Sequence, residues 1–249
     1  MADSPAAPAA AAAAELRPSL SVFNSSFCAS ADGPPPLRTL RRVAVFCGSS
    51  SGATPEFVEA ATALGEEMVK RNISLVYGGG NVGLMGAVAT AVARGLGPAA
   101  VIGVIPDWLA PAEISGAGVG EVRLVKDMHS RKAAIFAEAD AFISLPGGFG
   151  TLDETLEIMT WSQLGLHAKP VGILNVGGFF DHLLKFFDHA TESGFVRAAS
   201  RRIAVDARTP GPLLDALEAY AAPPAVVALP RAVAAMAAAH SDQIANQLG

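Results

Sequence analysis

The chain has 249 residues, 51% of them hydrophobic, so it is long enough to bury a sizeable core in one or two domains. Its formal net charge of −5 argues against a nucleic-acid or anionic-membrane binder, and no apolar run is long enough to suggest a membrane span. Its two cysteines, Cys28 and Cys47, are far apart, which argues against a disulfide framework or a cysteine-based zinc site and favours a reducing compartment.

The two ends of the chain differ in composition from the middle. Residues 1–40 are rich in Ala, Ser and Pro and hold few large apolar side chains, so we expect a disordered tail. Its serines fit a transit peptide, but the early acids Asp3 and Glu15 and the scarcity of arginine argue against plastid import. Residues 223–249 form an Ala-rich second tail, expected to be partly helical or disordered. Residues 41–222 remain as the folded domain.

Within this domain, short β-branched runs alternate with segments of helical length. The predicted strands are 43–47, 73–77, 101–105, 121–125, 141–145, 171–174 and 203–205. The predicted helices are 55–71, 84–94, 128–138, 151–164, 179–193 and 212–221, with residues 106–120 irregular. Strands that are apolar nearly throughout and separated by helices indicate a parallel sheet covered on both faces. The sequence therefore predicts a single Rossmann-like, doubly wound α/β domain.

Glycine-rich stretches follow three of these strands, directly after Cys47, Tyr77 and Leu145. Parallel strands present their carboxyl ends at one edge of the sheet, and doubly wound folds bind ligands outside that edge. We therefore expect the three stretches to surround one ligand site.

The stretch after Tyr77 contains Gly78-x-Gly80-x-x-Gly83, which formally matches the dinucleotide-binding fingerprint. The pattern is weak in a glycine-rich chain and does not fall in the first strand–helix unit. A general nucleotide contact is one alternative. Close packing of the following helix on the sheet, which Gly83 and Gly86 would permit, is another.

The stretch after Leu145 reads Pro146-Gly-Gly-Phe-Gly-Thr-Leu-Asp-Glu154 and leads into a helix. Glycines let the backbone approach an anion, and the amide groups and dipole of a helix start favour phosphate. Thr151 and Glu154 also match a capping box, in which the glutamate only returns to the backbone of the threonine. The residues alone leave both roles open for Glu154, a cap or a catalytic acid.

Arg131 and Lys132 fall in the first turns of the predicted helix 128–138, where the helix dipole disfavours cations. They are either solvated at the surface, or Arg131 faces an anion or nucleobase across the crevice. Glu113, in the irregular segment 106–120, either closes the site from above or is an ordinary loop charge.

These motifs together resemble the LONELY GUY family of cytokinin riboside 5′-monophosphate phosphoribohydrolases. The loop 146–154 is similar to the family's PGGxGTxxE motif, and residues 128–132 are similar to its MHxRK segment. The stretches Val-Phe-Cys-Gly-Ser-Ser, Tyr-Gly-Gly-Gly-Asn-Val-Gly-Leu-Met-Gly and Thr-Trp-Ser-Gln-Leu-Gly-Leu-His extend the resemblance over roughly residues 41–221. Phe149 stands where tyrosine is common, at a position that tolerates variation.

The resemblance implies hydrolysis of the N-glycosidic bond of an N6-prenylated adenosine monophosphate, which gives the free cytokinin base and ribose 5-phosphate. Arg131 and Glu154 match the catalytic pair. The positions that match substrate contacts are Glu113, Arg131, Lys132, Gly147, Gly148, Phe149, Gly150, Thr151, Leu152, Asp153, Glu154 and Thr160. A homodimer in the cytoplasm, with the nucleus as a second compartment, and a small-molecule nucleotide as the only other partner are also expected.

The chemistry of these residue types agrees with that activity. Breaking a ribose–adenine bond develops positive charge at the anomeric carbon, which an ionised Glu154 would stabilise while orienting water. Arg131 does not readily give up a proton, so we expect it to clamp the substrate or to act electrostatically. Phosphate held at the glycine loop would fix the ribose, so a nucleoside without phosphate should react poorly.

Two other functions remain open on the sequence. A non-catalytic nucleotide or cofactor carrier could use the same loop on the same fold. An amino-acid decarboxylase would need a lysine that holds pyridoxal phosphate, and Lys132 is the lysine near the motifs. The five histidines show no metal-ligand spacing, so we predict neither a metal nor a cofactor. Surplus aromatic residues at Phe179, Phe180, Phe186, Phe187 and Phe195 would suit either a core or a subunit contact.

Overall fold

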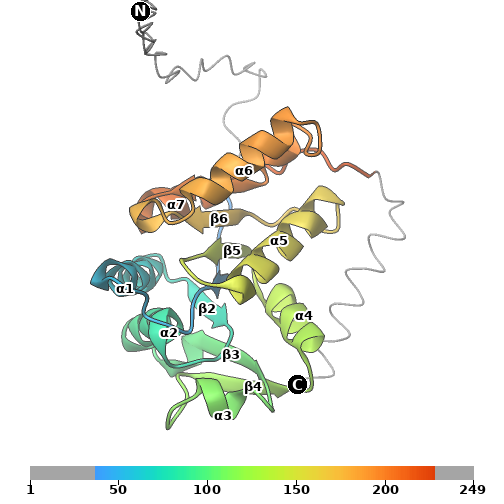
Figure 1. The fold of residues 1–249 in the computed structure, drawn as a ribbon. Helices are drawn as coiled ribbons and strands as arrows, with labels where there is room; N and C mark the ends of the chain where they lie inside the picture. The colour runs from blue at the N-terminus through green and yellow to red at the C-terminus, as the bar shows by residue number, and fades with distance from the viewer. Residues whose placement is uncertain (1–36, 228–249) are drawn as a thin grey trace, which may run out of the picture. The chain divides into compact units, whose positions relative to one another are not determined.

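The computed structural model describes residues 37–227, which belong to one compact unit (Figure 1). The strands are β1 (Arg42–Phe46), β2 (Ser74–Tyr77), β3 (Val101–Pro106), β4 (Glu121–Val125), β5 (Ala141–Ser144), β6 (Val171–Leu174) and β7 (Ala204–Ala207). The α-helices are α1 (Pro55–Lys70), α2 (Gly83–Leu96), α3 (Ala110–Glu113), α4 (Met128–Glu138), α5 (Phe149–Gln163), α6 (Asp181–Glu192) and α7 (Pro210–Glu218). Each predicted strand and helix is confirmed to within a few residues.

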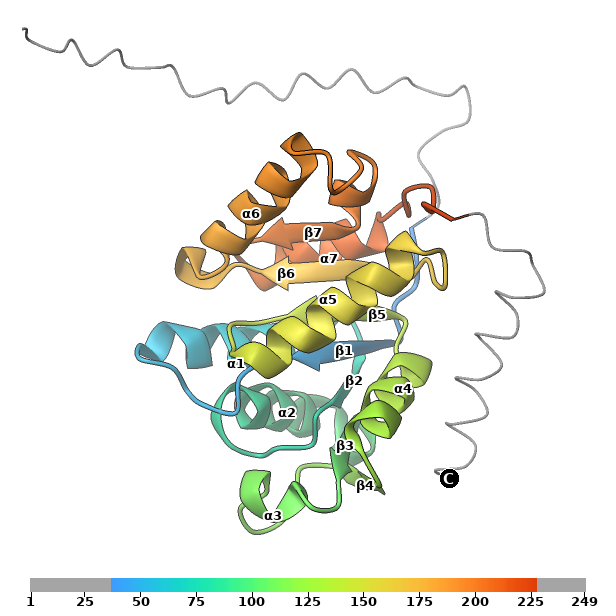
Figure 2. The same ribbon diagram turned by 45° about the vertical axis from the view of Figure 1, so that its right-hand side comes forward.

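The seven strands form one parallel sheet in the order β4-β3-β2-β1-β5-β6-β7. Side chains of β1 alternate between two cores, because Val43 and Val45 point to one face while Ala44 and Phe46 point to the other. Helices α1, α2 and α7 cover the first face, and α4, α5 and α6 cover the second (Figure 2). The doubly wound Rossmann-like fold is therefore confirmed.

The chain reverses its direction of travel across the sheet between β1 and β5. It builds outward from β1 to β4 and then returns to place β5 on the other side of β1. The pairing of β1 with β5 continues past the strand ends, since Gly48 donates its amide hydrogen to the carbonyl of Pro146 at 3.0 Å. This switch point brings the loop after β1 beside the loop after β5.

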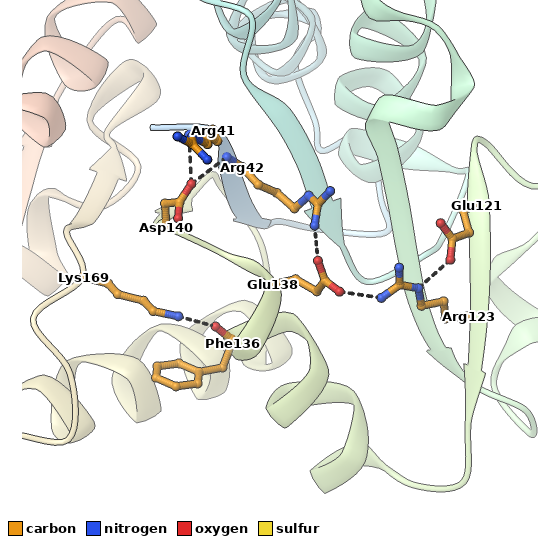
Figure 3. Close-up of polar contacts among 8 residues, drawn as sticks. All are labelled: Arg41, Arg42, Glu121, Arg123, Phe136, Glu138, Asp140 and Lys169. Atoms are coloured by element: carbon orange, nitrogen blue, oxygen red, sulfur yellow. Dashed lines mark hydrogen bonds and ion pairs between the residues drawn. The ribbon is translucent and has the colours of Figure 1, made fainter. Parts of the chain in front are cut away.

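An ionic network anchors the opposite, amino-terminal edge of the sheet (Figure 3). Glu138, at the end of α4, forms ion pairs with Arg42 of β1 and with Arg123 of β4. Arg123 also pairs with Glu121 at 2.6 Å. Asp140 accepts hydrogen bonds from the backbone amides of Arg41 and Arg42. The far end of α4 is thus tied to two strands.

Three findings refine the sequence-based description. The segment 106–120, predicted to be irregular, contains the short helix α3. Leu40 is buried in the core, and Arg38 donates its backbone amide hydrogen to the carbonyl of Glu218. The rest of the two predicted tails, residues 1–36 and 228–249, lies outside the described residues. Among residues 37–227, no helix is long and apolar enough to cross a membrane.

Candidate functional site

A cavity of about 350 Å³ opens at the carboxyl edge of the sheet, beside the switch point between β1 and β5. Two of the three glycine-rich stretches, those after Cys47 and Leu145, contribute to it, together with the segment around α3 and helices α2 and α4. The lining residues are Cys47, Gly48, Ser49, Met85, Leu109, Glu113, Met128, Arg131, Gly148, Phe149, Gly150, Thr151, Asp153 and Glu154. The cavity thus opens at the sheet edge where the sequence predicts a ligand site, although the glycine-rich stretch after Tyr77 does not line it.

Helix α5 begins directly at this cavity. Its N-cap is Gly148, which has no side chain to cap the helix, so the first-turn amide groups keep free hydrogen-bonding capacity. Thr151 lies within the first turn and is not the cap. The capping-box alternative for Glu154 is therefore wrong, because the helix starts two residues before the threonine.

Glu154 lies on the buried side of α5 and lines the cavity. Burial is the main cause that raises the pKa of its carboxyl; Arg131 and Lys132 lower it, Asp153 and Glu113 raise it, and the net pKa is about 7. A carboxyl group that titrates near neutral pH is suited to proton transfer in the physiological range.

Arg131 projects from α4 toward Glu154, with 3.8 Å between Arg131 Nη2 and Glu154 Oε1. Asp127 caps α4 by accepting a hydrogen bond from the amide of Ser130. Arg131 is only 7% exposed and its Nε has no hydrogen-bond partner, so the surface alternative is wrong for this residue. A buried guanidinium this close to a carboxyl group can hold an anionic substrate or stabilise developing negative charge.

Gly78, directly after β2, makes room for this guanidinium group. A Cβ atom at position 78 would collide with Arg131 Nη2. No local sequence pattern connects Gly78 with Arg131, which lies far along the chain. The available signal was the glycine itself, at the carboxyl end of a central strand.

We expect Gly78→Ala to lower kcat at least about tenfold while the protein stays folded, because the methyl group displaces Arg131 and misplacements near 1 Å are costly. Steady-state kinetics and thermal melting measure the two effects. Gly211→Ala is the matched control, since a Cβ there meets nothing within 4 Å. Wild-type kcat in the Gly78 variant would contradict the dependence of Arg131 on the space beside Gly78.

Of the fingerprint-like glycines after β2, Gly83 serves close packing. Gly83 begins α2 with a φ of +59°, and a Cβ there would collide with the backbone of Ser49. Of the three fingerprint glycines, none lines the cavity, although Met85 of α2 does. The packing alternative for this motif is the one that the geometry favours.

Glu113 lies at the end of the cavity formed by α3, beside apolar Leu109, Met85 and Met128. Its Oε2 is buried and has no hydrogen-bond partner. The thiol of Cys47 also lines the cavity, and burial raises its pKa above the usual range, so it stays protonated. The cavity lining thus combines apolar side chains and one unpartnered acceptor with the amide-rich start of α5.

Four residues that the resemblance assigned to the substrate do not line this cavity. Lys132 is held by Asp153 and Glu157, and Leu152 packs against the core. Gly147 lines a neighbouring hollow together with Phe57 and Phe179. Thr160 is exposed farther along α5 and borders a separate groove between α5 and α6. Among residues 37–227, no group of three or more His, Cys, Asp or Glu side chains could hold a metal ion.

The chain is similar to known proteins across most of its length. The family model described as "Possible lysine decarboxylase" matches residues 85–217. A probable cytokinin riboside 5′-monophosphate phosphoribohydrolase of Oryza sativa subsp. japonica is 57% identical over 180 residues, which cover 72% of this chain and 73% of that protein. A cytokinin riboside 5′-monophosphate phosphoribohydrolase of Arabidopsis thaliana is 55% identical over 180 residues, which cover 72% of this chain and 82% of that protein.

The fold is also similar to solved structures. A molybdenum cofactor carrier protein from Chlamydomonas reinhardtii superposes with a TM-score of 0.53 at 20% identity, covering 71% of this chain and 94% of that chain. At this identity the likeness concerns the fold alone.

Proposed function

The chain belongs to the family of cytokinin riboside 5′-monophosphate phosphoribohydrolases, and we propose that Glu154 and Arg131 carry out its reaction in the cavity beside β1 and β5. The enzyme hydrolyses the N-glycosidic bond of a cytokinin riboside 5′-monophosphate and releases the active free base. The observation that carries the assignment of residues is the buried carboxyl–guanidinium pair at 3.8 Å, facing an amide-rich helix start.

The two ends of the cavity suggest how the nucleotide lies. Its phosphate meets the backbone amides from Gly148 to Thr151, where the helix dipole favours an anion. Its base occupies the end formed by α3, where Glu113 Oε2 is free to accept a hydrogen bond from the N6 amino group and apolar side chains line the wall. The ribose then lies over Glu154 and Arg131.

This placement gives each catalytic group a task. The glycosidic electron pair leaves with the base, and positive charge develops at C1′, where the carboxylate of Glu154 stabilises it. Glu154 also accepts a proton from the water that attacks C1′, which its raised pKa permits near neutral pH. Arg131 stays charged and stabilises the negative charge that grows on the leaving base. The base then takes up a proton from solvent to become the neutral free base, and Glu154 returns its proton to solvent.

Incubation with N6-isopentenyl adenosine monophosphate tests this function. We expect equal amounts of free base and ribose 5-phosphate, measured by chromatography. The matching nucleoside should react at least about a hundredfold more slowly, because phosphate binding at the start of α5 positions the ribose. Tight binding of the nucleotide without release of base would instead favour a carrier.

Neither of the other two functions has comparable support. The relatives at 55–57% identity are named as phosphoribohydrolases, whereas the carrier structure shares 20% identity. A lysine decarboxylase needs a lysine amine free to form a Schiff base. Lys132 Nζ instead lies 3.2 Å from Asp153 and 3.1 Å from Glu157. Burial lowers the pKa of Lys132, but its hydrogen bonds to Glu157 and Asp153 outweigh that effect and raise it, so the amine stays protonated.

We also propose that the enzyme is a homodimer that resides in the cytoplasm, with the nucleus as a second compartment. Its two subunits would meet through the outer surfaces of α5 and α6 and the turn after α6. Phe186 of α6 is 61% exposed and Phe195 of that turn is 86% exposed, while Phe180 and Phe187 are buried in the core. Leu156, Leu164 and Thr160 lie on the same surface of α5. The free thiol of Cys47 fits a reducing compartment.

Light scattering measures the subunit contact directly. We expect twice the chain mass of 25.4 kDa for the wild type and a single chain mass for Phe195→Asp. Leu124→Asp is the control, since Leu124 is an exposed apolar residue of β4, away from α5 and α6. A wild-type mass equal to that of a single chain at micromolar concentration would contradict the dimer.

A further inference from the structure

Helices α4 and α5 are linked next to the catalytic pair by a second, separate set of charges. Lys132 directly follows Arg131 on α4, while Asp153 and Glu157 flank Glu154 on α5. Lys132 Nζ donates to Asp153 Oδ2 at 3.2 Å and lies 3.1 Å from Glu157 Oε1. The Lys132 side chain is 14% exposed and that of Glu157 is 25% exposed, so the bridge is well shielded from solvent.

The catalytic pair does not lock itself in place. Its 3.8 Å separation is longer than a hydrogen bond. The Arg131 guanidinium otherwise contacts only the Met128 sulfur among the described polar groups, at 4.0 Å, and its Nε is unpartnered. The distance between Arg131 and Glu154 therefore depends on how α4 and α5 are held relative to each other.

We propose that Lys132 and Glu157 form a positioning bridge, which sets the catalytic geometry of Arg131 and Glu154 without touching the substrate. The proposal rests on the function proposed above and gives Lys132 a role other than the substrate contact that the resemblance implies. Glu157 contributes to this positioning through its contact with Lys132. Asp153, more exposed and lining the cavity, is the weaker support of the bridge.

Two physical effects make the bridge matter for turnover. Removing one partner of a shielded ion pair leaves the other charge uncompensated and lets the helices shift, and small shifts at a reacting pair are costly. Lys132 also lowers the pKa of Glu154 through its charge. Loss of Lys132 therefore changes both geometry and titration, whereas loss of Glu157 changes geometry while the cation remains.

The test compares Lys132→Met, Glu157→Gln and the double variant in steady-state kinetics with N6-isopentenyl adenosine monophosphate. We expect each single variant to lower kcat by about tenfold or more with KM changed less than about twofold. The double variant should be no slower than Lys132→Met, because both changes break one bridge. Lys132→Arg, which can still contact two carboxylates, should recover most of the loss.

The pH profile separates positioning from a purely structural role. In Lys132→Met, the acid limb of kcat/KM should move to higher pH, because the charge that lowers the Glu154 pKa is gone. In Glu157→Gln it should not move upward. Asp215→Asn is the matched control, since it removes an ion pair between Arg71 and α7 at 2.8 Å, far from the cavity, and should change neither kcat nor the profile.

Three outcomes would overturn the proposal. A raised KM with unchanged kcat in Lys132→Met, and no effect of Glu157→Gln, would make Lys132 a substrate ligand. Unchanged kinetics in both variants would leave the bridge without a role. If Lys132→Met does not fold, a wild-type kcat in Glu157→Gln is sufficient to reject it. Failure of the proposed function itself would appear separately, as no base released by the wild type.

Discussion

Glu154→Gln lowers kcat by at least about a hundredfold, while the variant remains folded and still binds the nucleotide. The amide keeps the size of the carboxyl group but neither accepts a proton from water nor carries negative charge toward C1′. Glu154 lines the cavity and does not cap α5, so the helix loses no hydrogen bond to its start. Assay of released base gives kcat, and isothermal titration gives nucleotide affinity. A variant with at least half the wild-type kcat would rule out the catalytic role.

The same variant should be more stable than the wild type at alkaline pH. The folded-state pKa of Glu154 is raised to about 7, so the stability that its protonated form contributes is fully present below pH 4.5 and is lost as pH rises through 7. Glutamine mimics the protonated form at every pH. At pH 8.5 the gain is on the order of 3 kcal/mol, and below pH 4.5 it vanishes. Equal melting temperatures of the two proteins at pH 8.5 would contradict the raised pKa.

Arg131→Met is the second change with a large expected effect, a loss of about a hundredfold or more in kcat/KM. The substitution removes the cation that faces the leaving base and the carboxyl of Glu154. It also removes the charge that most opposes the raised pKa of Glu154, so the acid limb of the pH profile should move to higher pH. Part of the lost activity should therefore return between pH 7 and 9.

Arg131→Lys distinguishes charge from geometry at this position. Lysine keeps the positive charge and so keeps the acid limb near its wild-type position, but it lacks the planar fork and should recover kcat only in part. Thermal melting of both variants accounts for lost packing, since the Arg131 side chain is buried. An acid limb that stays in place in Arg131→Met would show that Arg131 and Glu154 are not electrostatically coupled.

The fold could be predicted because its pattern is local. Strands such as β1, apolar on both faces, alternate with helices of clear periodicity, and only a covered parallel sheet satisfies both. The same topology predicted the sheet edge at which the cavity opens, because glycine-rich loops follow the strand ends there.

The details of the site depend on contacts that no local pattern encodes. The start of α5 was misplaced because Gly148 caps the helix without a side chain, whereas Thr151 carried a recognisable motif. The burial of Arg131 depends on space left by Gly78, in the loop after β2. The engagement of Lys132 depends on Glu157, a residue outside every motif. In the last two cases the deciding residue lies on a different element, so its influence appears only after folding.

One consequence concerns the order in which the protein acquires activity during refolding. The catalytic pair is divided between α4 and α5, and Trp161 of α5 packs edge-on against Phe136 of α4 at a ring distance of 5.1 Å. Indole fluorescence of a Trp108→Phe background therefore reports the docking of these two helices. Recovery of hydrolysis after dilution from denaturant should follow the Trp161 signal in time and should not precede it, even where the far-ultraviolet signal has already recovered.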